Sequence, residues 1–154
     1  MSQLKSKRRS QSKAKYVNVA YDIHAAAMEL AVRLSPRYGR VYTAEVAALA
    51  HKLSDECEIT QKIYPSNEQR VKAREFHLCE ARGALSALDS KLTEIYVILL
   101  NNPQGAFTTG SGKKIPAKDA ERILENLAEN VGTLIDIEDT AISGVLDSDR
   151  KLKF

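Results

Sequence analysis

The sequence predicts an all-α protein, arranged as an antiparallel up-down four-helix bundle. The 154 residues include no tryptophan and only 6% aromatic residues, and long stretches rich in Ala, Leu, Glu and Lys favour helix. Apolar residues recur at steps of three and four in four separate segments, which places them on one face of each helix. Burying four such faces together gives a four-helix bundle. We expect helices at 17–35, 43–64, 67–100 and 117–146.

The first two predicted helices are separated by a proline. Ser35 and Pro36 are expected to end the first helix, because proline disfavours helical geometry in the residue before it. A short turn over 37–40 should follow, with Thr43 as the N-cap of the second helix. Pro65 ends the second helix. The first apolar face is formed by Ala20, Ile23, Ala27, Leu30 and Leu34, and the second by Val46, Leu49, Leu53, Cys57 and Tyr64.

The third predicted helix has the most regular pattern in the chain. Ser66 and Gln69 have the spacing of a capping box at its start. Apolar residues then alternate steps of three and four for three heptads, which predicts a coiled-coil-like seam. The seam is formed by Leu78, Ala81, Leu85, Leu88, Leu92, Ile95 and Leu99.

A long loop is expected between helices three and four. Asn101, Asn102 and Pro103 break the third helix, and Pro116 is suited to the first turn of the fourth. Within the loop, 107–109 and 113–115 flank a Gly-Ser-Gly turn, which fits a small hairpin or a disordered segment equally well.

Charge divides the chain into three parts. Residues 1–15 contain no acidic residue, and we expect them to form a basic, disordered arm joined to a bundle at 16–147 and a short basic tail at 148–154. The cations of the arm are Lys5, Lys7, Arg8, Arg9, Lys13 and Lys15. Without these six charges, the net charge of +3 becomes −3 for the rest. The arm suits the phosphates of nucleic acid, and a solubilising tail is the equal alternative.

Catalytic and metal-binding motifs are not found, so we predict no enzyme activity, no metal and no cofactor. The residues three positions before His24, His51 and His77 are Tyr21, Ala48 and Arg74, so the Glu-x-x-His motif of di-iron bundles is missing. Gly110, Gly112 and Lys113 lack the other residues of a phosphate loop. A Ser-His-Asp arrangement stays open from sequence alone. Cys57 and Cys79 are expected to be buried and reduced.

Surface charge offers the remaining functional signal. Basic residues gather near the first turn and at the start of the third helix, and we take them with the arm as candidate contacts to nucleic acid or a partner. They are Arg37, Arg40, Arg70, Lys72 and Arg74. The fourth helix is expected to present an acidic surface, formed by Asp119, Glu121, Glu125, Glu129, Asp136, Glu138 and Asp139.

Several short motifs resemble a family of small bacterial four-helix-bundle proteins. The family includes the accessory variability protein of diversity-generating retroelements and the ribosomal-RNA intervening-sequence proteins. The resemblance lies in Tyr21-Asp22, in the turn from Ser35 to Arg40, in the Arg- and Ala-containing start of the third helix, and in 124–144 with its late glycine. It covers roughly 16–147.

The resemblance implies a homopentameric, non-catalytic accessory scaffold. Such a protein would bind a reverse transcriptase together with its RNA or cDNA and support mutagenic retrohoming. The alternative is a helical oligomerisation or adaptor module whose partner is a protein only. No apolar run is long enough to span a bilayer and the basic N-terminus has no apolar segment behind it, so we expect a cytoplasmic protein without membrane contact.

Overall fold

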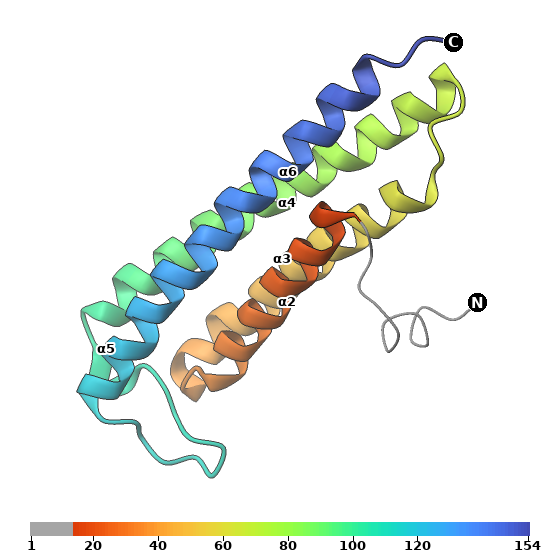
Figure 1. Ribbon diagram of the computed structural model, residues 1–154. Helices are drawn as coiled ribbons and strands as arrows, with labels where there is room; N and C mark the ends of the chain where they lie inside the picture. Colours follow the sequence, from red (N-terminus) through yellow and green to blue (C-terminus); the bar gives the residue numbers. More distant parts are fainter. Residues whose placement is uncertain (1–13) are drawn as a thin grey trace, which may run out of the picture.

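The computed structural model describes residues 14–154, and these form a helical bundle (Figure 1). Over this range all regular structure is helical, as predicted, apart from two isolated β-bridges. Four long helical segments account for the bundle, the fourth being continuous through a π-helical turn. The elements are α2 (Lys15–Arg33), α3 (Pro36–Lys62), α4 (Glu68–Leu100), the 3-10 turn η1 (Pro103–Gly105), α5 (Ala117–Asn126), the π segment η2 (Leu127–Val131) and α6 (Gly132–Arg150).

Helix α3 begins seven residues earlier than predicted, because Pro36 starts the helix as well as ending α2. Ser35 has extended geometry (φ −59°, ψ 155°), and Pro36 occupies the first helical position, where its missing N–H is not needed. The predicted turn at 37–40 is therefore helical, and the assignment of Thr43 as N-cap was wrong. The Thr43 hydroxyl instead donates to the Ala31 carbonyl (3.0 Å), which ties α3 to α2.

Helix α4 confirms the predicted seam, although its cap differs. Asn67 is the N-cap, and its side-chain oxygen accepts a hydrogen bond from the Arg70 amide (2.9 Å). The predicted capping box of Ser66 and Gln69 is thus wrong by one residue. All seven seam residues from Leu78 to Leu99 are buried.

The connection after α4 has the hairpin that the sequence allowed. Thr108 pairs with Lys114 in an antiparallel bridge, and the Thr109 amide donates to the Lys113 carbonyl (2.8 Å). Gly112 has φ +83°, which glycine adopts without steric cost. Phe107 is buried and pairs with Leu34, so the core anchors this long connection.

The fourth helical segment begins at Ala117 and continues to Arg150. Pro116 is its N-cap, one position before the first turn in which it was expected. The helix passes through the π segment η2 and ends four residues later than predicted, so the tail predicted at 148–154 begins inside α6.

Helix packing closes the bundle around a core of Leu, Ile, Val and Ala. Helix α2 packs against α3, α3 against α4, and α6 against both α4 and α2. Figure 1 shows the end of α6 beside the start of α4, with the connection 101–116 at the opposite end of the bundle. Within the described range, none of the helices combines the length and apolar character needed to cross a membrane.

Candidate nucleic-acid interface

Arg74 lies inside the bundle, where it joins the ends of three helices. Its Nε donates to Asp149 Oδ2 (2.7 Å) near the end of α6. Its Nη1 donates to the carbonyls of Thr60 (2.9 Å) and Ile63 (2.7 Å) at the end of α3. The position follows from sequence, because Arg74 is one helical turn before Leu78 on the buried face of α4.

The burial of Arg74 corrects its assignment as a surface contact. Its guanidinium is committed to one carboxylate and two carbonyls, and the residue is buried. Arg74 therefore organises this end of the bundle and is not available to a polyanion. Its carbonyl partners lie in the last turn of α3 and just after it, where the regular hydrogen bonds of the helix run out.

Six exposed cations surround the helix ends that Arg74 joins, and we call this surface the basic end. They are Lys15, Lys62, Arg70, Lys72, Lys151 and Lys153. The Tyr16 hydroxyl donates to Gln61 Oε1 (2.7 Å), which places the start of α2, and with it Lys15, beside the end of α3. Across residues 14–154, none of these six side chains has a carboxylate within ion-pair distance.

Two of the acidic residues at this end have a cationic partner, whereas Glu68 and Asp147 are exposed. Asp149 is bound by Arg74, and Glu75 accepts a hydrogen bond from Arg150 (2.9 Å). Glu68 is exposed in the first turn of α4, where a carboxylate suits the helix dipole. The six cations therefore outnumber the exposed carboxylates Glu68 and Asp147 at the basic end.

Two aromatic rings are exposed beside these cations. Tyr64 is 73% exposed in the connection from α3 to α4, and Phe154 is 63% exposed after α6. An exposed ring next to lysines and arginines is a combination that nucleic-acid-binding proteins use. Neither aromatic was among the binding residues predicted from sequence. Tyr64 was predicted to lie on the apolar face of the second helix, but α3 ends at Lys62 and leaves Tyr64 exposed. Its place between Lys62 and Pro65 was the signal that could have indicated this.

The remaining predicted contacts are not brought together with the basic end. Arg37 and Arg40 are exposed at the start of α3, about 33 Å or more from Lys62 at 1.5 Å per helical residue. Arm residues Lys5, Lys7, Arg8, Arg9 and Lys13 lie outside the described residues. Lys15, predicted to belong to the disordered arm, is instead the first residue of α2, and the rest of the arm joins the chain at this end of the bundle.

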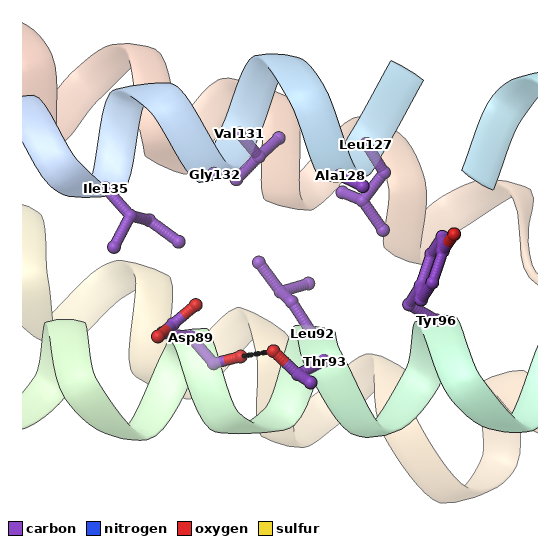
Figure 2. A pocket seen from close by; sticks show the side chains of 9 residues that line it. All are labelled: Asp89, Leu92, Thr93, Tyr96, Leu127, Ala128, Val131, Gly132 and Ile135. Atoms are coloured by element: carbon purple, nitrogen blue, oxygen red, sulfur yellow. Dashed lines mark hydrogen bonds between the residues drawn. The ribbon is translucent and has the colours of Figure 1, made fainter. Parts of the chain in front are cut away.

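An apolar groove lies on another face, beside the π segment. Figure 2 shows Leu92 of α4 facing Val131 and Ile135 across the groove, which has a volume of about 250 Å³. Asp89 and Thr93 add polar groups along its α4 side, where the Thr93 hydroxyl donates to the Asp89 carbonyl (2.8 Å). The groove is a candidate surface for a protein partner.

Glu138 is buried, which corrects its place in the predicted acidic surface. The side chain is fully inaccessible, and neither carboxylate oxygen has a hydrogen-bond partner in the described part of the chain. Burial raises the pKa of Glu138 to about 8. Burial, and then the charge of Glu138, also raises the pKa of the Cys57 thiol well above its ordinary value. Both cysteines are free, but Cys79 is exposed, which corrects the expectation that both are buried.

The histidines take part in local contacts between neighbouring helices. His24 Nδ1 lies 3.0 Å from the Ser54 hydroxyl, and its ring packs 4.6 Å from the ring of His51. Burial lowers the pKa of His24. His77 Nδ1 lies 2.6 Å from Glu56 Oε2. No set of three side chains suited to a metal ion occurs in the range 14–154.

Comparisons with known proteins give no match. No family model matches the chain, and no curated protein and no solved structure is significantly similar to it. The resemblance to the retroelement accessory proteins thus stays a prediction that rests on the motifs quoted above.

Proposed function

We propose that the protein is a non-catalytic helical scaffold that binds nucleic acid through its basic end. The observation that carries the proposal is the set of six exposed, unpaired cations around helix ends that Arg74 fixes in place. Lysine and arginine side chains release counterions when they approach phosphates, which drives sequence-independent binding. The basic arm is joined to the chain at this same end.

We infer an antiparallel, up-and-down order of the helices from the contacts between them. Tyr16 at the start of α2 meets Gln61 at the end of α3, and Arg74 near the start of α4 meets Asp149 near the end of α6. At the other end, Thr43 of α3 reaches the Ala31 carbonyl of α2. This order brings residues that are distant in the sequence, such as Lys15 and Lys151, to one end of the bundle.

The narrower role that the resemblance implies is retained within this proposal. A homopentameric accessory subunit of a reverse transcriptase would hold RNA or cDNA and a protein partner on different surfaces. The basic end supports the first contact, and the apolar groove beside the π segment supports the second. A cytoplasmic location is part of the same proposal.

A protein-only adaptor is the second candidate function. Several apolar side chains are exposed at the end opposite the basic end, including Val32, Val41, Val97 and Leu100. Together with the groove they supply apolar surface of the kind that protein interfaces bury. This candidate requires no affinity for polyanions, so nucleic-acid binding separates the two functions.

Neutralising two cations of the basic end is expected to weaken nucleic-acid binding and to reduce its dependence on salt. Affinity falls with salt, so the slope of log affinity against log salt is negative. In the variant Arg70→Gln/Lys72→Gln this slope should become less steep by about two units, because each phosphate contact contributes about one unit. Fluorescence anisotropy with labelled RNA and DNA at several salt concentrations measures both quantities.

The matched control is Arg37→Gln/Arg40→Gln, which removes the same number of charges at the opposite end of α3. It is expected to keep most of the affinity and nearly the full slope. Equal losses in the two double variants would contradict a localised interface. If the unmodified protein binds neither RNA nor DNA at low salt, the adaptor function replaces the proposal.

A further inference from the structure

Tyr64 has a fixed backbone and a free ring. The preceding residue, Ile63, donates its amide to the Thr60 carbonyl (3.1 Å), and its own carbonyl is held by Arg74 (2.7 Å). The Tyr64 carbonyl accepts a hydrogen bond from the Ser66 amide (2.8 Å), and Pro65 restricts the chain between them. The residue is nevertheless 73% exposed, so a fixed backbone presents an aromatic side chain to solvent.

The surroundings of Tyr64 select what the ring can bind. Lys62 lies two residues before it, and Arg70 and Lys72 lie in the first two turns of the following helix. Such cations attract phosphates, which brings a nucleic-acid backbone to the ring. An aromatic ring offers stacking to the face of a base, and only an unpaired base exposes that face.

We infer that Tyr64 is a stacking platform for an unpaired base and that the basic end takes single-stranded RNA or DNA in preference to a duplex. The inference rests on the proposed function, because the surrounding cations must first hold the backbone. The ring adds affinity that a duplex cannot gain, since the bases of a duplex are stacked on one another. Little ordering entropy is lost on binding, because the backbone around Tyr64 is already fixed.

Measuring the affinity for single strands and duplexes of equal length tests this inference. The full-length protein is titrated into labelled twelve-nucleotide oligo(dT) and oligo(U), neither of which self-pairs, and into a twelve-base-pair duplex of mixed sequence. Tyr64→Ala is expected to weaken single-strand binding about tenfold and to leave duplex binding within a factor of about two. Tyr64→Phe keeps the stacking face and should restore the single-strand affinity.

Two controls separate stacking from loss of fold or of charge. Val41→Ala shortens an exposed apolar side chain at the other end of α3 and should change neither affinity. Thermal melting followed by circular dichroism should show that Tyr64→Ala is folded, since the ring is mostly in solvent.

The inference is overturned if Tyr64→Ala binds single strands as tightly as the unmodified protein, or if it loses single-strand and duplex affinity equally. In both cases, a reduced salt slope in the Arg70→Gln/Lys72→Gln variant would leave the proposed function standing. An unmodified protein that binds neither kind of probe would instead remove the proposed function together with the inference.

Discussion

Replacing Arg74 with methionine is expected to lower the free energy of unfolding by about 3–5 kcal/mol. Methionine fills much of the same volume but donates no hydrogen bond. The Asp149 carboxylate would then be buried without a partner, and the carbonyls of Thr60 and Ile63 would lose the hydrogen bond from Arg74, with Thr60 keeping the one from the Ile63 amide. Removing one partner of a buried ion pair is costly because the remaining charge stays desolvated. Urea unfolding followed by circular dichroism measures the loss.

Arg150→Met is the matched control, because Arg150 pairs with Glu75 (2.9 Å) on the exposed surface near the same end. Exposed ion pairs contribute little, so we expect Arg150→Met to unfold at nearly the same urea concentration as the unmodified protein. The double variant Arg74→Met/Asp149→Leu should recover part of the lost stability, since it removes the unpaired carboxylate but does not replace the hydrogen bonds that Arg74 donates to the two carbonyls. If Arg74→Met is no less stable than Arg150→Met, the role assigned to Arg74 is wrong.

Glu138→Gln is expected to raise the free energy of unfolding by about 3 kcal/mol at pH 7. The pKa of Glu138 rises from 4.5 to about 8 on folding, because the carboxyl is buried. Between these two values the folded protein holds a proton that the unfolded chain releases. The contribution of Glu138 to the free energy of unfolding is therefore most favourable below pH 4.5. It falls as pH rises and becomes constant above about pH 8. Glutamine carries no ionisable proton and so removes this penalty.

Unfolding in urea at pH 5, 6, 7 and 8 measures this effect as a difference between Glu138→Gln and the unmodified protein. The difference should widen with pH, whereas Glu129→Gln, an exposed substitution in the π segment, should show no such trend. A difference that is constant across the four pH values would show that Glu138 does not change its protonation on folding.

Regular apolar spacing predicted where the helices lie, whereas the residues at which they begin and end were predicted less accurately. The seam from Leu78 to Leu99 depends only on helical periodicity, and every member is buried. Pro36 illustrates the limit, because one proline can end the preceding helix and start the next with no turn between them. Whether the second helix starts at once or after several residues depends on tertiary contacts, here Thr43 with Ala31, that the pattern does not contain.

The candidate interface was predicted in part, and the errors have a common cause. Arg70 and Lys72 are exposed as expected, whereas Arg74 and Glu138 are buried. Both buried residues continue an apolar stripe, since Arg74 precedes Leu78 by four positions and Glu138 precedes Ile142 by four. Their charge suggested surface, but their phase on the helix indicated the core. The grouping of Lys15, Lys62 and Lys151 was not predicted, although the antiparallel order expected from the sequence places these helix ends together.

The π segment Leu127–Val131 determines where this chain tolerates a change in length. An α-helix turns by about 100° per residue, so deleting one residue of α6 before Ile142 would rotate the rest of the helix and turn Ile142 away from the core. A π turn accommodates one residue more than an α turn, because its hydrogen bonds join positions five apart. Deleting one residue within this segment would convert it to a regular α-helix while Leu124 before it and Ile135 after it still face inward. The joint between α5 and α6 is therefore the point at which the helix can lose a residue without losing its phase.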